Sequence, residues 1–382
     1  MDPPKRTFLL LTLMTSLFII IQATACLHAQ ENFTLYVPLL AAAPSPVRLI
    51  WFYKPPQAES PAFMQEHFDT FILTKSDEPT QEALRAEGVT TPFLQYLRFD
   101  AIHAPGSCTA QPWRNQVADQ PGDFCAISAE HPEWFLVDQR GNRIMDHDRE
   151  QRYFLMDPGH EGWRAFWLER ARQSQEAIGW DGVFLDNVEG SLSKRQRGGA
   201  LPAAYPTDAS YQAAIEGFLA YLHDSYFAPQ GRPLQANIIE LKDSATWLRY
   251  LQHLDGVMEE GWAVDWSTGY LPVSRWEEQV RRMEQSQVAG KEVILVAQGG
   301  RNEIARQEFA LASYLLVASE HTSFRYSHAD FYHEVWLYDN YRLALGTPLG
   351  PRYRVADFWQ RDFTHGSVRV SPATHTATIV VH

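Results

Sequence analysis

The sequence predicts an α/β protein, a (β/α)₈ TIM barrel followed by a small C-terminal β appendage. Three observations lead to this prediction. From residue 47 onward, short apolar runs alternate with longer amphipathic stretches, which is typical of βα units and a parallel sheet. Eight of the apolar runs have the length of strands, which is the number that a closed barrel needs. No glycine-rich phosphate fingerprint follows the first run, which disfavours an open doubly wound sheet.

The predicted strands share short apolar or β-branched runs, and helical periodicity separates most of them. The strands are Val47–Tyr53, Thr70–Leu73, Pro92–Leu97, Gly182–Asp186, Leu234–Ile238, Gly256–Glu260, Glu292–Ala297 and Ser323–Tyr326. The helices are Glu161–Ala177, Tyr211–Tyr226, Trp276–Ala289 and Glu303–Ala318. We therefore place the barrel at residues 47–330.

The segment between the third and fourth predicted strands is unusually long, and it contains Cys108 and Cys125. Long βα loops of a barrel lie on the face that carries the active site. Apart from Cys26 these are the remaining cysteines of the chain, and such an even pair in an exported chain predicts a disulfide between them, with two unpaired thiols as the alternative.

Residues 331–382 end in near period-two alternation, as in Gly366–Val370 and Thr378–Val381. This pattern predicts a β-rich extension that packs on the barrel.

The first residues have the features of a signal peptide. Lys5 and Arg6 precede an apolar run, Phe8–Ile21, and the small residues Ala23–Ala25 then fit a cleavage site. We predict a signal peptide at residues 1–25 and a secreted or extracytoplasmic protein. An uncleaved membrane anchor is the alternative, because the run is near the lower length limit of a span.

Cys26 follows the predicted cleavage site directly, so a lipid anchor on a cell-surface protein is a second form of attachment. Residues 26–46 end in Ala-Ala-Ala-Pro-Ser-Pro, a composition that suits a tether.

Composition disfavours several classes of function. The formal net charge of −13 argues against nucleic acid or an anionic membrane surface as a partner. The histidines form no HExxH pattern and the cysteines have no paired ligand spacing, so we expect no metal site and no cofactor. A Gly-x-Ser-x-Gly nucleophile elbow is also absent.

Carboxylates end the fourth and sixth predicted strands, at Asp186 and Glu260. Glycosidic cleavage needs two carboxyl groups, one to protonate the leaving oxygen and one to attack or to activate water. In a barrel, strand ends converge on one bowl, so we predict Asp186 and Glu260 as the catalytic pair. A helix N-cap or an ion-pair partner is the structural alternative for Asp186.

Strand register favours Glu260 over Glu259. The string Asp181–Asp186 aligns with Asp255–Glu260, so Asp186 falls on Glu260. Because neighbouring side chains alternate between faces, Glu259 is then expected to point the other way.

Polar and aromatic residues at the other strand ends are candidates for contacts with a sugar, whose hydroxyls need hydrogen-bond partners and whose C–H faces pack on aromatic rings. Packing in the barrel wall, or an ordinary surface position for the lysine, is the alternative for each. The predicted substrate-binding residues are Lys54, Tyr53, Tyr96, Arg98, Asn187, Asn237, Trp262, Gln298 and Tyr326, with Trp266 as a further stacking candidate.

Several short motifs give the chain a family resemblance. They are Trp51–Pro56, Pro132–Leu136, Asp157–Gly159, Asp181–Asn187, Asp255–Gly261, and Arg361–Phe363 with Gly366. In these motifs, residues 47 to about 375 resemble the hypothetical glycosyl hydrolase family fifteen, a group of TIM-barrel glycoside hydrolases of unknown substrate. A more distant likeness is to endo-α-1,4-polygalactosaminidase, which shares the Asp181–Asp186 type of strand. The resemblance implies an O-glycosyl hydrolase with acids after strands four and six, at Asp186 and Glu260.

We therefore expect a secreted glycoside hydrolase that acts on a poly- or oligosaccharide. In this expectation Glu260 is the general acid and Asp186 is the nucleophile or base. The alternative is a non-catalytic carbohydrate-binding or cell-surface protein on a barrel scaffold.

Overall fold

The computed structural model describes residues 46–146, 153–241, 243–267 and 269–382. The predicted signal peptide and the predicted tether up to residue 45, including Cys26, lie outside these residues. Within the described ranges, no helix has the length and apolar character needed to cross a membrane.

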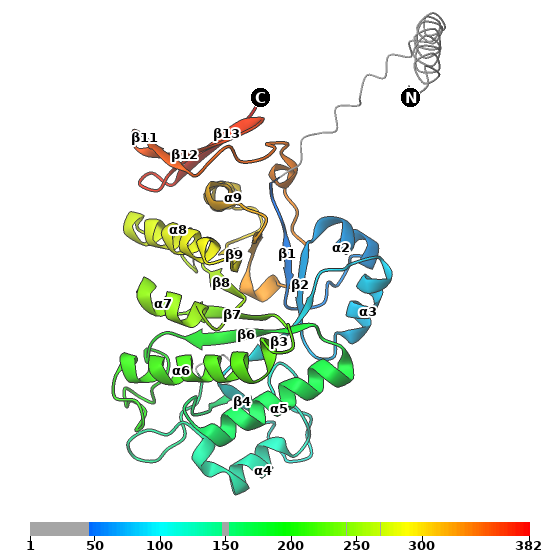
Figure 1. The fold of residues 1–382 in the computed structure, drawn as a ribbon, viewed down its shortest axis with the longest axis vertical. Helices are drawn as coiled ribbons and strands as arrows, with labels where there is room; N and C mark the ends of the chain where they lie inside the picture. Colours follow the sequence, from blue (N-terminus) through cyan, green and yellow to red (C-terminus); the bar gives the residue numbers. More distant parts are fainter. Residues whose placement is uncertain (1–45, 147–152, 242, 268) are drawn as a thin grey trace, which may run out of the picture. The chain divides into compact units, whose positions relative to one another are not determined.

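The chain forms a nearly closed barrel of eight parallel strands, which confirms the predicted fold class (Figure 1). The sheet closes where Leu49 pairs in parallel with Phe324, whose amide donates to the carbonyl of Arg48 at 2.8 Å. The barrel strands, in spatial order, are β1 (Ile50–Phe52), β2 (Thr70–Leu73), β3 (Phe93–Arg98), β6 (Gly182–Glu189), β7 (Leu234–Ile239), β8 (Gly256–Glu260), β9 (Glu292–Gln298) and β10 (Thr322–Ser327).

Each predicted strand overlaps one of these eight, and each of the four predicted helices overlaps an observed helix. In the described residues the α-helices are α2 (Pro61–His67), α3 (Glu78–Ala86), α4 (Asp123–Glu130), α5 (Glu161–Ile178), α6 (Asp208–Leu222), α7 (Ser244–Leu251), α8 (Val273–Val288) and α9 (Ile304–Val317). A π-helical turn, η2 (His223–Phe227), extends α6.

The helices between neighbouring strands that helical periodicity did not predict are short. Helices α2, α3 and α7 join neighbouring strands and have only seven to nine residues each. Side-chain caps mark the starts of two of them: Ser60 accepts from the amide of Phe63 at 3.2 Å, and Asp243 accepts from the amide of Thr246 at 2.7 Å. Helices of this length have too few turns for a clear apolar stripe.

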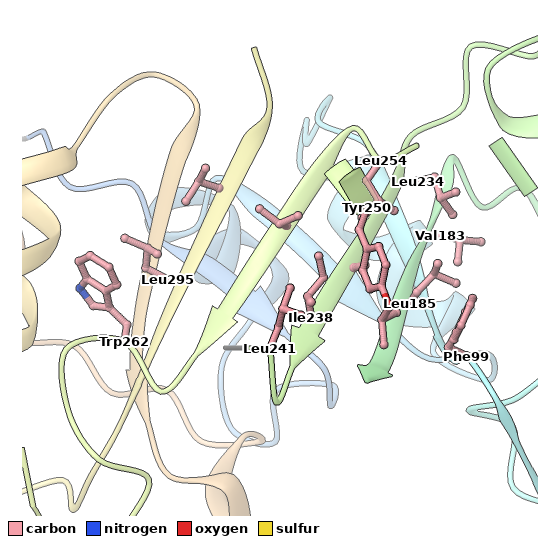
Figure 2. Packing of buried hydrophobic residues seen from close by; sticks show 14 of the residues in the cluster. Phe99, Val183, Leu185, Leu234, Ile238, Leu241, Tyr250, Leu254, Trp262 and Leu295 are labelled. Carbon is pink, nitrogen blue, oxygen red and sulfur yellow. The ribbon is translucent and has the colours of Figure 1, made fainter. Parts of the chain in front are cut away.

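Two apolar clusters fill the protein. The inner cluster lies inside the barrel and contains Ile50, Phe52, Ile72, Leu94, Tyr96, Phe184, Met258, Ile294, Val296 and Tyr332. The outer cluster lies between the strands and the helices, and Figure 2 shows part of it, including Val183, Leu185, Leu234 and Leu295. Residues 183 to 185 of β6 thus alternate between the two clusters, as expected for a barrel strand.

The long segment between β3 and β6 has its own structure. It contains a small antiparallel pair, β4 (Ala101–His103) with β5 (Tyr153–Leu155), and the turn η1 (Pro132–Trp134) beside α4. Cys108 and Cys125 form a disulfide in this segment, as the cysteine count suggested.

The C-terminal part forms a four-stranded antiparallel sheet that lies against α9 (Figure 1). Its strands are β11 (Tyr353–Val355), β12 (Phe358–Phe363), β13 (Gly366–Ser371) and β14 (Thr376–Val381). Arg361 donates to the carbonyls of Leu315 at 3.2 Å and Ala318 at 2.8 Å, and so satisfies acceptors at the end of α9. Between β10 and this sheet lie the turns η3 (Ala329–Phe331) and η4 (Asp339–Arg342).

Candidate active site

The carboxyl ends of β6 and β8 place two acids at the same end of the barrel interior. Phe184 and Met258 belong to the inner cluster. Because side chains alternate along a strand, Asp186 and Glu260, two positions later, face the same interior.

A bulge at the end of β6 sets the position of Asp186. The register between β6 and β7 shifts between Leu185 and Val188, and Asn187 adopts a left-handed backbone with φ of 60°. Bulges of this kind redirect a side chain at a strand end. The carbonyl of Asn187 accepts from Nη2 of Arg195 at 3.4 Å, which holds the bulge from behind.

Arg195 is itself fixed by a buried charge network. Its side chain is 1% exposed and pairs with Asp100 at 3.1 Å, Asp146 at 3.5 Å and Glu189 at 3.6 Å. Burial raises the pKa of Glu189 to about 7 despite the neighbouring guanidinium. A buried cation among several acids holds its position firmly, because moving it away would leave buried acids without a compensating charge.

One side chain links the two candidate carboxylates. Nδ2 of Asn237 lies 3.0 Å from Oδ1 of Asp186 and 2.7 Å from Oε2 of Glu260, so these two oxygens are within about 5.7 Å of each other. Asn237 is fully buried on β7, the strand between the two that carry the acids. The predicted pair of acids therefore converges.

The remaining two carboxylate oxygens also accept hydrogen bonds. The Tyr96 hydroxyl donates to Oδ2 of Asp186, and the Tyr332 hydroxyl donates to Oε1 of Glu260 at 2.5 Å. Nε2 of Gln298 in turn donates to the Tyr332 oxygen. All four oxygens of the pair thus have a fixed donor, which orients both carboxyl planes before a substrate enters.

The environment of Glu260 favours its protonated form. Burial, and then the nearby charge of Asp186, raise the pKa of Glu260 to about 7, although hydrogen bonds from Tyr332 and Asn237 act in the opposite direction. A carboxyl group whose pKa lies near neutrality can donate a proton at physiological pH.

Glu259 has different partners, as the register argument expected. One of its oxygens accepts from Nε2 of Gln279 at 3.1 Å, and the other pairs with Nη1 of Arg282 at 3.3 Å. Burial raises the pKa of Glu259 as well, but its carboxylate is engaged with α8 rather than with Asp186.

Aromatic rings form the wall of the site on the side of β1 and β3. The rings of Tyr53 and Tyr96 stack with centroids 4.4 Å apart, and the ammonium of Lys54 lies 5.0 Å from the Tyr53 centroid. Burial, followed by the charge of Asp186, raises the pKa of Tyr53 to about 12. The phenol therefore stays neutral and can donate a hydrogen bond to a substrate or accept one from it.

Two other predicted binding residues lie near the pair. Arg98 is buried, pairs with Asp146, and has its guanidinium 4.0 Å from the centroid of Tyr153. Asn187 is half-buried and lines a pocket described below.

The structure places Trp262 and Tyr326 in the core rather than in the site. Trp262 is fully buried, and its indole donates to the carbonyl of Ala310 in α9 at 3.2 Å (Figure 2). Tyr326 is 1% exposed and donates to the carbonyl of Gly300 at 3.2 Å. Both belong to the outer cluster, so neither ring can stack on a sugar, and barrel-wall packing describes them correctly.

Tyr332 was not predicted, and Arg325, although it lies near the end of the eighth predicted strand, was not among the predicted binding residues. Arg325 points inward from β10, and its Nη2 donates to the carbonyl of Tyr332 at 2.6 Å. Tyr332 comes from the loop after β10 and not from a strand end. Alternation of side chains along β10 predicts that Arg325 points into the barrel, whereas the loop sequence gives no comparable signal for Tyr332.

Two pockets flank the carboxylates on the loop face of the barrel. The first, which we call the β8 pocket, has a volume of about 540 Å³ and is formed by loops after β6, β7 and β8, with Glu260 in its wall. Its lining includes Asn187, Lys194, Glu240, Asp265 and the exposed Trp266.

The second, which we call the β1 pocket, has a volume of about 450 Å³ and is formed by loops after β1, β2 and β4, with Tyr53 in its wall. The acid pair therefore lies between two hollows that are large enough for sugar units.

Within the described ranges, His223, Asp224 and His253 form a group whose ligand atoms lie within 4.8 Å of one another. His223 and Asp224 belong to η2, just before β7, and His253 lies between α7 and β8. Segments that precede barrel strands lie at the amino end of the barrel. This group is therefore separate from the acid pair.

Similar folds occur among solved structures. The glycoside hydrolase domain of PelA from Pseudomonas aeruginosa is 15% identical, with a TM-score of 0.50, over 76% of this chain and 97% of that domain. TtGalA, an α-galactosidase from Thermus thermophilus, is 14% identical, with a TM-score of 0.48, over 88% of this chain and 68% of that one. No curated protein sequence matches the chain.

The sequence profile of one family covers more than half of the chain. The profile described as hypothetical glycosyl hydrolase family 15 matches residues 100–367, which include Asp186 and Glu260. The match is shorter than the expected range from residue 47, and it leaves out the Trp51–Pro56 motif. The chain belongs to the hypothetical glycosyl hydrolase family 15.

Proposed function

We propose that this protein hydrolyses O-glycosidic bonds of a poly- or oligosaccharide with Asp186 and Glu260 as its pair of catalytic carboxyl groups. Family membership supports a glycosidase-like function. The observation that carries the mechanism is the Asn237 bridge, which holds the inward-facing Asp186 and Glu260 side by side.

Glu260 is the proton donor in this proposal. Its raised pKa, about 7, keeps a substantial fraction of the carboxyl group protonated at neutral pH. The β8 pocket gives a leaving group room beside this proton.

Asp186 is the nucleophile. Retaining glycosidases separate their two carboxyl groups by about 5 to 5.5 Å, and inverting enzymes by about 6.5 to 9.5 Å, which leaves room for a water molecule. The Asn237 bridge keeps Oδ1 of Asp186 and Oε2 of Glu260 within about 5.7 Å of each other, which is closer to the retaining separation than to the inverting one.

The reaction then has two steps. An oxygen of Asp186 attacks the anomeric carbon, and the bond to the glycosidic oxygen breaks as that oxygen takes the proton of Glu260. Glu260, now a carboxylate, removes a proton from water, whose oxygen attacks the same carbon and releases Asp186. Tyr96 and Asn237 hold Asp186 in line during both steps.

Retention of configuration is the expected stereochemical outcome. Once a substrate has been found, proton NMR can follow the first minutes of its hydrolysis. The first product should have the anomeric configuration of the starting linkage, before mutarotation. First appearance of the opposite anomer would exclude Asp186 as a nucleophile and assign it the role of a base.

The pH profile should depend on Tyr332. Since its hydrogen bond lowers the pKa of Glu260, removal of the hydroxyl should raise that pKa further. The alkaline limb of kcat/KM reports loss of the proton from the general acid, so it should lie near pH 7 in the wild type and move to higher pH in Tyr332→Phe.

Tyr338→Phe is a matched control for this measurement, because the hydroxyl of Tyr338 donates to the carbonyl of Arg301 and not to an acid of the site. If the limb stays in place in Tyr332→Phe, Glu260 is not the group that it reports.

We also propose that the protein is exported. The charged and apolar segment before Ala25 supports a cleaved signal peptide, and the Cys108–Cys125 disulfide fits an oxidising compartment. Cys26 would then be the first residue of the mature chain and a potential lipid attachment site. Mass spectrometry of the N-terminus of the exported protein should find cleavage after Ala25, and an intact Met1 on cytoplasmic protein would contradict export.

A further inference from the structure

The β1 pocket differs in charge from the rest of the protein. The chain has a net charge of −13, yet the pocket is lined by Lys54, Lys75 and Arg114, and none of its described lining residues is acidic. Its walls come from loops after β1 and β2 and from the segment after β4, which are neighbours on the loop face of the barrel. Three separate segments thus bring cations to one hollow.

Two of these cations are available to a ligand. Lys75 pairs with Asp119 at 2.6 Å, so its charge is compensated. Lys54 and Arg114 are exposed, and neither makes an ion pair with any residue that the structure describes. Asp77 is near Lys54, but its carboxylate is buried and accepts from Thr74 at 2.8 Å and 2.6 Å.

A hydrogen bond to the loop after β2 holds the Arg114 side chain in position. Its Nη1 donates to Oγ of Ser76 at 2.8 Å. Ser76 has a left-handed backbone with φ of 95°, and its amide donates to Glu78 at 2.8 Å. A residue other than glycine is strained in this conformation, and such strain is often found where a loop positions functional groups.

An aromatic platform lies beside the cations. Trp113 is 41% exposed, and its ring stacks on His103 with centroids 5.0 Å apart at 16°. The Tyr153 ring also meets the indole, edge-on with centroids 5.8 Å apart, and the exposed part of Trp113 is open to a ligand. An exposed indole next to cationic side chains suits a sugar that carries a negative charge.

Tyr53 connects this pocket to the acid pair. It lines the pocket and stacks on Tyr96, whose hydroxyl donates to Asp186. The β8 pocket reaches Glu260 from the opposite half of the barrel. A glycan chain that crosses both pockets would therefore pass the two carboxyl groups between them.

We propose that the β1 pocket is a subsite for a sugar unit with an anionic substituent, which Lys54 and Arg114 bind while the ring lies on Trp113. The shared chemistry is a fixed negative charge on a sugar, either the carboxylate of a hexuronate or a sulfate ester. This inference rests on the proposed function, because it places the subsite on the path of the substrate of Asp186 and Glu260.

Direct binding tests the subsite separately from catalysis. The Glu260→Gln protein, full-length, would be titrated calorimetrically with oligosaccharides from polygalacturonate, alginate and hyaluronan, each beside its carboxyl-reduced neutral counterpart, and with a sulfated galactan oligosaccharide beside its desulfated form. We expect at least one acidic oligosaccharide to bind about tenfold more tightly than its neutral counterpart, and added salt to reduce the difference.

The same titration would be repeated with Lys54→Gln or Arg114→Gln added to the Glu260→Gln protein. Each change should reduce the preference for the acidic oligosaccharide by about threefold. Arg140→Gln is the matched control, because Arg140 is an exposed arginine on a turn outside both pockets, and it should leave the preference unchanged.

The carboxylate and sulfate arms identify which anion is bound. The proposal is overturned if no acidic oligosaccharide binds more tightly than its neutral counterpart, or if the preference survives the loss of both cations. Absence of hydrolysis by the wild type would count against the proposed function alone, because the binding result stands independently of turnover.

Discussion

Asp186→Asn should lower kcat by a factor on the order of 10⁴ or more, which is the largest effect that we expect from a single substitution. The amide has nearly the shape of the carboxylate, so it can fill the same place between Tyr96 and Asn237. It cannot form the glycosyl ester, and hydrolysis then has no covalent route. Initial rates of reducing-sugar release would give the ratio.

Asp186→Ala distinguishes a nucleophile from a residue that only positions the site. In a retaining enzyme, azide can enter the space left by the side chain and attack the anomeric carbon, giving a glycosyl azide of inverted configuration. Recovery of activity with azide is the expected result for a nucleophile. An Asp186→Asn protein with rates within about tenfold of wild type would exclude covalent catalysis by Asp186.

Glu260→Gln should lower kcat by about 10² to 10⁴ on a natural glycan, since this is the usual contribution of a general acid. In kcat/KM, which reports the first step alone, the loss should be much smaller for an aryl glycoside with a dinitrophenolate leaving group, because this group departs without protonation. The difference between the two substrates is the signature of proton donation, and a structural defect would impair both equally.

Glu169→Gln provides a matched control for this substitution. Glu169 is an exposed residue of α5 whose carboxylate pairs with Arg172 at 2.9 Å. It should retain wild-type activity on both substrates. Equal losses of kcat/KM for natural and activated substrates in Glu260→Gln would assign Glu260 a positioning role.

The barrel could be predicted from the sequence because both faces of each strand are buried. Consecutive residues of a strand are therefore apolar and form a recognisable run. Strands buried between an inner and an outer cluster stand out from the amphipathic helices that follow them. The same regularity placed Asp186 and Glu260 on one side, since both lie two residues beyond an inward apolar side chain, Phe184 and Met258.

Two predicted binding residues, Trp262 and Tyr326, lie in the core instead. The first lies beyond the end of its strand, where alternation no longer holds, and for the second the alternation was not considered. Trp262 lies two residues beyond the last residue of β8, in a turn that carries its indole back to α9. Tyr326 follows the inward Arg325, so alternation already points it outward. A chemically suitable residue near a strand end can therefore be predicted to bind a substrate only when alternation along the strand also points its side chain into the barrel.

Tyr332 could not be predicted, because its position depends on the path of the loop after β10. The Arg325 side chain fixes that loop by donating to the carbonyl of Tyr332, and the phenol then reaches Glu260. Such a contact joins residues that are 72 positions apart in the chain, and no local pattern records it. The buried Arg195 network behind the Asp186 bulge is likewise visible only in the folded protein.

Catalysis by the Asp186 and Glu260 pair is tested most directly by reducing-end release from a panel of polysaccharides, including amino-sugar polymers. Wild-type protein, Asp186→Asn, Glu260→Gln and Glu169→Gln would be assayed side by side, after circular dichroism has shown that all four are folded. We expect wild type and Glu169→Gln to cleave the same polymer, with no measurable cleavage by Asp186→Asn and strongly reduced cleavage by Glu260→Gln. Equal cleavage by all four proteins, or binding of a polymer by wild type without any cleavage, would contradict the proposed catalytic pair.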